Sequence, residues 1–272
     1  MIPDPIAMIA GNGVYPATFA AAARRAGVEK LVAAAFIDET KPELAQQVNA
    51  IEWLRVGQLS KMISFFKKHD IHHAVMVGQI APSNLFDLRP DMRLLFMLAR
   101  VKKRNAESLF GAIAGELQKD GIELLLATTF LEDSMPGPGH VAGPNPRQRR
   151  WDDARYGFDI AKASSKLDIG QTVVVKNGTV LAVEAFEGTN EAIKRGGRLG
   201  KGGATMVKVS KPNQDMRFDV PVIGPATITA AAEAGVDIIV IEAHKTLLLE
   251  KESVFQLCAQ NKVSLLALEE NL

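Results

Sequence analysis

The stretch PIAMIAGNGVYPATFAAAARRAG, residues 5–27, decides the fold of the first half of this chain. Residues 5–10 are a short apolar run, typical of a buried strand, that ends at Gly11-Asn12-Gly13. Residues 15–26 are rich in alanine and predict a helix closed by Gly27, and a second apolar run follows at 31–37. This order of strand, loop, helix and strand predicts the opening of a parallel sheet.

The alternation continues to about residue 133. The predicted elements are an amphipathic helix at 59–69, a strand at 74–77, one long helix at 93–119 and a strand at 122–127. We therefore predict an α/β fold that opens with a Rossmann-like N-terminal domain over residues 1–133, built on a parallel sheet.

Residues 134–150 break the pattern because Pro and Gly are concentrated there, and we predict that they connect two domains. Beyond them, Asn177-Gly178 between two β-branched runs indicates a hairpin. The predicted elements are helices at 151–165 and 228–234 and strands at 171–175, 179–185, 206–209 and 238–241. Antiparallel pairing distinguishes this half from the first, so we predict a mixed α/β C-terminal catalytic domain over residues 151–272.

Composition limits the classes of function. Of 272 residues, 47% are hydrophobic, which is enough for a sizeable core, and the net charge of +1 gives no general attraction to nucleic acid. The single cysteine, Cys258, cannot form an intrachain disulfide and is expected in the core. We find no signal-peptide pattern and no apolar stretch of about 18 residues, and we expect a cytoplasmic protein.

Gly11-Asn12-Gly13 lies between a predicted strand and a predicted helix, where glycines let backbone N–H groups approach a phosphate. The dinucleotide fingerprint requires a third glycine at position 16, where the chain has Pro16. Three interpretations remain open: a nicotinamide dinucleotide site, a nucleotide contact without nicotinamide, and a tight turn without a ligand.

Two acidic residues, Glu184 and Glu187, stand three apart where a predicted strand ends and side chains can converge. In residues 194–203 four basic residues alternate with five glycines, which predicts a loop that binds a di- or triphosphate. The alternative is a flexible solvated loop. Gln171, which precedes the first strand of this half, either faces the same cleft or belongs to a turn that caps the strand.

Residues 208–221 combine carboxylates and cations directly after a strand. Asp215 and Asp219 are hard oxygen ligands of the kind that magnesium prefers, and Lys208 and Arg217 are suited to phosphate oxygens. This mixture is what metal-assisted hydrolysis needs, and the alternative is a surface salt-bridge network. The histidines lack partners for a zinc site, and neither a Gly-x-Ser-x-Gly elbow nor a P-loop is present.

Several segments together resemble one known family, the LpxI-type UDP-2,3-diacylglucosamine pyrophosphatases of lipid A biosynthesis in Gram-negative bacteria. The resemblance runs in order through nearly the whole chain, and its specific part is C-terminal. The segments are residues 9–16, 168–175, 181–189, 208–215 and 219–224. The family usually has Asp where this chain has Asn190.

The resemblance implies two domains with the substrate bound between them, and magnesium-dependent cleavage of UDP-2,3-diacylglucosamine to UMP and 2,3-diacylglucosamine 1-phosphate (lipid X). It also implies that Asp219, in Asp-x-Pro-x-x-Gly, is the essential carboxylate. We expect Asp219, Asp215 and Lys208 to be catalytic. The expected ligands of Mg²⁺, or of Mn²⁺, are Asp219, Asp215, Glu184 and Glu187. The expected substrate-binding residues are Gly11, Asn12, Gly13, Gln171, Thr189, Lys211, Gln214 and Arg217.

The acyl chains of such a substrate need an apolar groove, for which residues 94–98 and 247–249 are candidates, although both are also typical of core. We expect transient contact with the cytoplasmic face of the inner membrane and no nucleic-acid partner, and a homodimer remains open. Two alternative functions are a nicotinamide-dependent oxidoreductase and a non-catalytic protein that binds a sugar nucleotide or a lipid.

Overall fold

The computed structural model describes residues 2–80, 90–101 and 106–270, and the chain divides into two compact units. The first unit comprises Met1–Glu132 together with Asp215–Asp219, and the second comprises Asp133–Gln214 and Val220–Leu272. The segment Asp215–Asp219 thus belongs to the first unit although its neighbours in sequence belong to the second.

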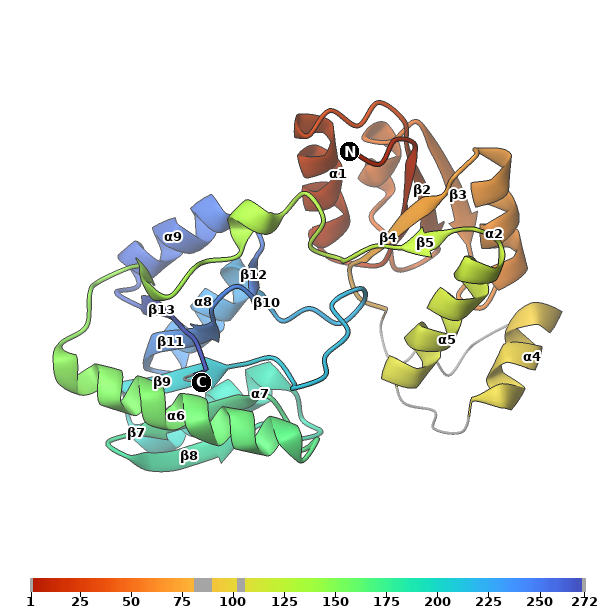
Figure 1. Ribbon diagram of the computed structural model, residues 1–272. Coiled ribbons are helices and arrows are strands. Elements are labelled where there is room, and N and C mark those ends of the chain that lie inside the picture. The colour runs from red at the N-terminus through yellow and green to blue at the C-terminus, as the bar shows by residue number, and fades with distance from the viewer. Residues whose placement is uncertain (1, 81–89, 102–105, 271–272) are drawn as a thin grey trace. The chain divides into compact units, whose positions relative to one another are not determined.

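The first unit is a three-layer α/β/α fold (Figure 1). Its parallel sheet has the strand order β3-β2-β1-β4-β5, so the chain reverses direction across the sheet between β1 and β4. This order confirms the predicted Rossmann-like domain. The elements are β1 (Ile6–Ala10), α1 (Tyr15–Arg25), β2 (Leu31–Phe36), β3 (Ala50–Leu54), α2 (Leu59–Lys68), β4 (His73–Val77), α4 (Met92–Arg100), α5 (Ala106–Lys119) and β5 (Glu123–Leu124).

Alternation along the strands divides the core between the two faces of this sheet. Ala7 and Ile9 of β1 face a cluster with α2, α4 and α5, while α1 covers the opposite face with the buried side chain of Phe19. The prediction of one helix over 93–119 is wrong, because α4 ends at Arg100 and Val101 is extended, with ψ 111°. Between Val101 and Leu109 the sequence offers no large apolar side chain to hold a continuous helix against the core. Residues 102–105 lie outside the described residues.

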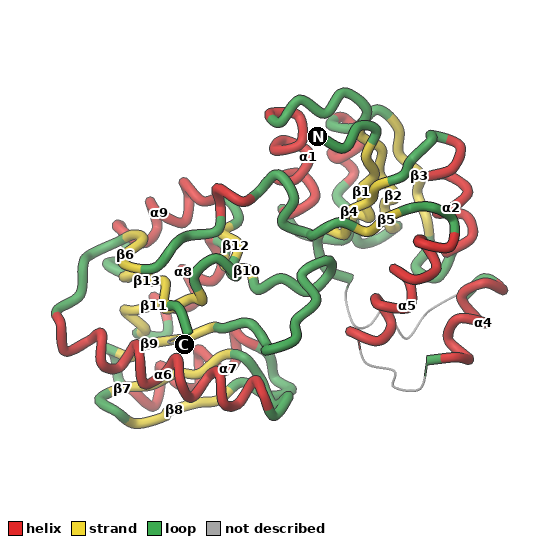
Figure 2. The backbone as a smooth tube through the Cα atoms, in the orientation of Figure 1, coloured by secondary structure: helices red, strands yellow, loops and turns green. Residues whose placement is uncertain are grey.

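The second unit has a mixed sheet with the strand order β6-β13-β11-β9-β7-β8, which confirms the predicted mixed topology (Figure 2). A two-stranded parallel pair, β10 with β12, accompanies it. The elements are β6 (Gly139–Ala142), α6 (Gln148–Lys166), β7 (Thr172–Lys176), β8 (Thr179–Val183), α7 (Thr189–Gly200), β9 (Ala204–Lys208), β10 (Val222–Ile223), α8 (Pro225–Glu233), β11 (Val236–Glu242), β12 (Leu247–Leu248), α9 (Lys251–Gln260) and β13 (Ser264–Leu268).

Two apolar layers hold this sheet. Helix α6 covers one face, while α7, α8 and α9 cover the other, where the fully buried Cys258 packs. Strands β7 and β8 form the predicted antiparallel hairpin, with both turn residues, Asn177 and Gly178, at positive φ. Part of the Pro/Gly-rich stretch 134–150 is itself in the sheet, because β6 pairs antiparallel with β13.

The glycines of residues 194–203 lie mostly in helix α7, so the predicted phosphate-binding loop is wrong. Gly196 and Gly197 face the core, where an added Cβ would lie 2.4 Å from Val174 Cβ and 2.0 Å from Ala234 O. Both residues belong to helix α7, and the absence of a side chain lets the helix pack closely against β7 at Gly196 and against the end of α8 at Gly197. Two of the basic residues pair with acids: Lys194 with Glu191 and Arg195 with Glu187.

Candidate functional site

Most of the predicted site residues of the second unit gather at one edge of its sheet. Strands β9 and β11 run parallel and end at this edge, β8 ends there, and the antiparallel β7 begins there. Thr172 pairs in register with Lys208, and Thr172 O accepts a hydrogen bond of 2.8 Å from Glu184 N. The carboxyl ends of parallel strands are the usual place for ligands in α/β sheets. The edge carries Gln171, Glu184, Glu187, Thr189, Lys208, Lys211 and Gln214.

Glu184 is held in place at this edge. Its Oε1 accepts a hydrogen bond of 2.8 Å from Thr189 Oγ1, at the first turn of α7, while its Oε2 is buried without a partner among the described residues. Gly170 allows this approach, since a Cβ there would lie 2.0 Å from Glu184 O. Glu187 instead pairs with Arg195 and accepts a hydrogen bond from Ala185 N. Hydrogen bonds from its own backbone N–H, from Arg195 and from Ala185 N lower the pKa of the Glu187 carboxyl.

Two glutamine side chains reach the same edge with unused hydrogen-bonding atoms. The backbone oxygen of Gln171 accepts a hydrogen bond of 3.0 Å from Val209 N, and the side-chain oxygen Oε1 of Gln214 accepts one of 2.7 Å from Lys211 N. Within the described part of the chain, Gln171 Oε1 and Gln214 Nε2 are buried and have no partner. Buried polar atoms are usually paired, so unsatisfied ones at a strand edge favour a ligand site.

The cations of this edge are already engaged by the protein. Lys211 forms an ion pair with Asp168, and Lys208 Nζ donates to Val222 O at 3.4 Å. Phe186 lies in the loop after β8 and is fully exposed, which is unusual for a phenylalanine and which the sequence analysis did not single out.

The remaining predicted residues lie in the first unit. Arg217 binds both carboxylate oxygens of Asp215, with Nε to Oδ1 at 2.9 Å and Nη2 to Oδ2 at 2.6 Å, and this lowers the pKa of Asp215. Asp219 N donates to Asp215 O at 2.9 Å. The Asp219 side chain is exposed, and no described residue forms a hydrogen bond or an ion pair with its carboxylate. It is therefore the carboxylate of this segment that is open to a ligand.

The segment Asp215–Asp219 is anchored in the first unit by backbone and aromatic contacts. Ala127 N donates to Met216 O at 2.9 Å, and Ala127 O in turn accepts from the buried Tyr15 hydroxyl at 2.6 Å. Burial raises the pKa of Tyr15, so this hydroxyl remains a donor at neutral pH. The ring of Phe218 packs 5.7 Å from that of Phe110.

An apolar cavity of about 420 Å³ lies at the carboxyl ends of the first unit's strands. Ile9 of β1 and Met76 of β4 border it, as do Gly11 and Gly78 directly after these strands and Phe218 of the segment Asp215–Asp219. Helices α2, α4 and α5 supply Leu59, Met62, Leu94, Leu109, Phe110 and Ile113. Its walls are almost entirely aliphatic and aromatic.

The motif Gly11-Asn12-Gly13 has a structural role at this edge. A Cβ on Gly11 would lie 2.3 Å from Gln79 O, so glycine is needed where the loops after β1 and β4 meet. Asn12 Nδ2 donates to Glu39 Oε2 at 2.7 Å, and Gly13 has φ 87°. These contacts favour the interpretation as a tight turn, and the structure shows Gly11 beside the cavity.

The four predicted metal ligands are divided between the units, Glu184 and Glu187 in the second and Asp215 and Asp219 in the first. Within residues 2–80, 90–101 and 106–270, no three His, Cys, Asp or Glu side chains are grouped as metal ligands. None of the described helices is long and apolar enough to cross a membrane.

Fold and site together define a two-unit α/β protein with a Rossmann-like first unit, a mixed second sheet with a polar edge, and an apolar cavity. Residues 5–134 match the LpxI N-terminal domain, and residues 137–266 match the LpxI C-terminal domain. The UDP-2,3-diacylglucosamine pyrophosphatase LpxI of Caulobacter vibrioides is 30% identical over 264 residues, which cover 92% of each chain. The chain therefore belongs to the LpxI family, and this assignment does not favour the nicotinamide-dependent alternative.

Proposed function

We propose that this protein hydrolyses the pyrophosphate bond of UDP-2,3-diacylglucosamine, giving UMP and 2,3-diacylglucosamine 1-phosphate, a step of lipid A biosynthesis. Membership of the LpxI family supports the reaction. The observation that carries the proposal is the apolar cavity of the first unit, whose wall includes Phe218, the residue directly before the exposed carboxylate of Asp219. The same short segment thus offers a contact for a lipid chain and a group for chemistry.

The cavity suits an acyl chain better than a nucleotide. A nucleotide needs several polar groups that fix its phosphates and ribose, whereas the side chains of this cavity are almost all apolar. Of the two grooves suggested by the sequence, residues 94–98 contribute Leu94 to the cavity. Residues 247–249 are instead buried in the second unit's core.

We propose Asp219 as the essential carboxylate, and Lys208 and Lys211 as cations for the phosphate oxygens. The unused amide atoms of Gln171 and Gln214 are our candidates for polar contacts with the nucleotide part. Arg217 holds Asp215 through paired hydrogen bonds, so we assign Asp215 a supporting role beside Asp219.

We further propose a dependence on Mg²⁺. Glu184 in the second unit and Asp219 in the first are separate candidate ligands for this ion, since each has a hard oxygen without a protein partner among the described residues, whereas Asp215 and Glu187 are engaged by arginines. Mg²⁺ is commonly held by one or two carboxylates plus substrate phosphates, so a grouped set of protein ligands is not required. When bound, the ion would polarise a phosphoryl oxygen.

The test is incubation with UDP-2,3-diacylglucosamine and Mg²⁺, with UMP measured by chromatography. We expect UMP from the wild type, none after chelation, and its return when Mg²⁺ is restored. Asp219→Asn should abolish turnover while circular dichroism remains unchanged. Asp70→Asn, at another exposed aspartate of the first unit, is the matched control and should retain activity. Absence of UMP from the folded wild type would contradict the proposal.

A substrate with two acyl chains is a membrane lipid, and we propose that α4 contacts the membrane surface. Met92, Leu95 and Phe96 on this helix are 65%, 46% and 63% exposed, while Leu94 of the same helix borders the cavity. Sedimentation with anionic vesicles tests this: Phe96→Ser should reduce the bound fraction without affecting hydrolysis of detergent-solubilised substrate. Equal sedimentation of both proteins would contradict it.

A further inference from the structure

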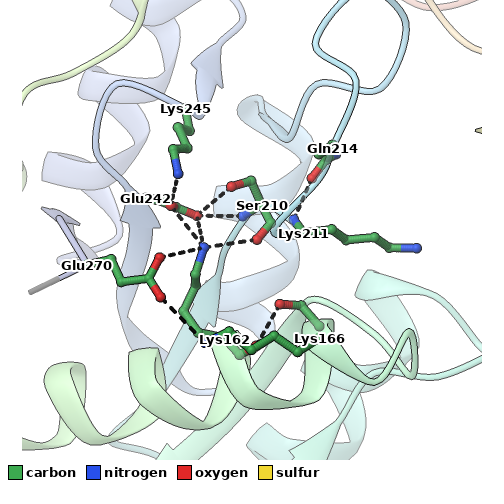
Figure 3. A network of polar contacts seen from close by, with 9 residues as sticks. Lys162, Lys166, Ser210, Lys211, Gln214, Glu242, Lys245 and Glu270 are labelled. Carbon is green, nitrogen blue, oxygen red and sulfur yellow. Dashed lines mark hydrogen bonds and ion pairs between the residues drawn. The ribbon is translucent and has the colours of Figure 1, made fainter. Parts of the chain in front are cut away.

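Ser210, two residues beyond β9, is held by two buried charged side chains (Figure 3). Its backbone N–H and its hydroxyl both donate to Glu242 Oε2, at 2.8 Å and 2.7 Å. Its carbonyl oxygen accepts from Lys162 Nζ at 3.3 Å. Every polar atom of Ser210 is thus engaged by Glu242 or Lys162.

The two charges come from different elements and lie inside the second unit. Lys162 is on α6 and is 5% exposed, and Glu242 ends β11 and is 1% exposed. Lys162 Nζ lies 3.1 Å from Glu242 Oε1 and 3.4 Å from Glu270 Oε2, while Lys245 donates to Glu242 at 2.8 Å. The sequence analysis missed this cluster, since its members are far apart in the chain.

Stability is a poor explanation for such a cluster. Removing two charges from water is costly, and well-packed apolar residues of similar volume often stabilise a protein as well or better. What buried ion pairs do supply is a fixed hydrogen-bonding geometry for the groups they contact. Here the contacted group is the backbone of Ser210, where the chain leaves the sheet.

The segment that begins at Ser210 carries the groups assigned to the reaction. Lys211 and Gln214 follow at once, then Asp215 and Asp219. Its far end is also tied to the second unit, because Leu247 N donates to Pro221 O at 2.9 Å. Both ends of the segment are therefore fixed by hydrogen bonds to the region in and just after β11.

We propose that Glu242 and Lys162 are positioning residues, which fix the start of the segment 211–219 so that its charged side chains are presented in one geometry. The inference rests on the proposed function for the reaction served, but the anchoring itself can be measured without substrate. Neither residue touches the substrate in this proposal; they act through Ser210.

The experiment combines hydrogen exchange with kinetics on the full chain. Ser210→Ala removes one hydroxyl and leaves the ion pair intact, and the double variant Lys162→Met/Glu242→Gln removes both buried charges together. The charged partners that remain, Lys245 and Glu270, have side chains that are 49% and 46% exposed. Lys166→Met, four residues further along α6 and mostly exposed, is the matched control, since its amine contacts Glu270 but not Glu242 or Ser210.

We expect amide exchange in a peptide covering 209–221 to rise about tenfold or more in the double variant and less in Ser210→Ala. At temperatures where all variants are folded, kcat should fall about 10- to 100-fold in the double variant, with a smaller change in KM, as for a displaced catalytic group. Lys166→Met should match the wild type in both measurements.

Unchanged exchange at 209–221 in the folded double variant would overturn the anchoring. Faster exchange with an unchanged kcat would overturn its role in the reaction. If the wild type releases no UMP, the proposed function fails, and the exchange measurement still decides whether Glu242 and Lys162 hold the segment.

Discussion

Filling the apolar cavity tests whether it holds an acyl chain. Ile113 on α5 borders the cavity and is partly exposed, so a tryptophan there would project into the space without replacing a fully buried core residue. Ile113→Trp adds about six non-hydrogen atoms to the side chain, at the expense of the cavity volume. Gln118→Trp, at an exposed position of the same helix, is the matched control.

The expected magnitude follows from the volume. A methylene group takes about the space of a water molecule in the liquid, ~30 Å³, so 420 Å³ holds on the order of a dozen methylenes. If the new indole excludes about four of them, at about 0.8 kcal/mol each, binding weakens by about 3 kcal/mol. This corresponds to about a 200-fold loss in kcat/KM.

The assay compares substrates of different acyl length. With the long-chain substrate, Ile113→Trp should show the full loss and Gln118→Trp almost none. With chains shortened by about four carbons the wild type and Ile113→Trp should be nearly equal, because the excluded methylenes are no longer present. A folded Ile113→Trp with wild-type kinetics on the long-chain substrate, or with the same loss at every chain length, would refute the assignment of the cavity.

Three further predictions concern stability and reactivity. Gly196→Ala places a Cβ 2.4 Å from Val174 Cβ and should lower the free energy of unfolding by about 1–3 kcal/mol in denaturant titrations. Gly115→Ala, whose added Cβ has no atom within 4 Å, should raise this free energy by up to about 1 kcal/mol. Burial raises the pKa of Cys258 to about 11, so iodoacetamide at pH 8 should label the native thiol far more slowly than the unfolded one, and equal rates would contradict its burial. Burial opposes ionisation of Glu242, but hydrogen bonds from Lys245, Ser210 and Lys162 lower its pKa below 4.5. The contribution of the ionised Glu242 to the free energy of unfolding is therefore present above pH 4.5 and lost as the pH falls below it. Acid should destabilise the wild type more steeply than Glu242→Gln, and parallel curves of unfolding free energy against pH would argue against this.

Local patterns predicted much of the fold. The apolar strand before Gly11 and the Asn177-Gly178 turn depend on interactions within a few residues, so sequence alone identifies the parallel opening and the hairpin. The prediction of one long helix over 93–119 failed because helix propensity was extended past Arg100, where α4 ends and Val101 is extended.

The glycines of α7 show where composition misleads and spacing does not. A glycine-rich basic stretch is compatible with a phosphate-binding loop, but Ala192, Gly196 and Gly200 recur at intervals of four. That period places small residues on one helical face, where they allow close approach to β7 and β8. The signal was present in the sequence, but it becomes decisive only when the partner surface is known.

The candidate site is predictable in its residue types and less so in its arrangement. Gln171, Glu184 and Lys208 converge because neighbouring strands begin or end at one edge, which strand order dictates. The assignment of Asp215–Asp219 to the first unit depends on contacts such as Phe218 with Phe110, which lie far apart in sequence.

Different kinds of contact hold the segment 211–219 and the residues beside it. Ser210 is fixed by buried charges of the second unit, whereas Phe218 is fixed by apolar packing in the first. Charge-assisted hydrogen bonds are directional and set the exit angle of the chain, while aromatic packing tolerates small shifts. Lys211 directly follows Ser210, and Asp219 directly follows Phe218, so loosening either contact should affect the reaction before it affects the stability of either core.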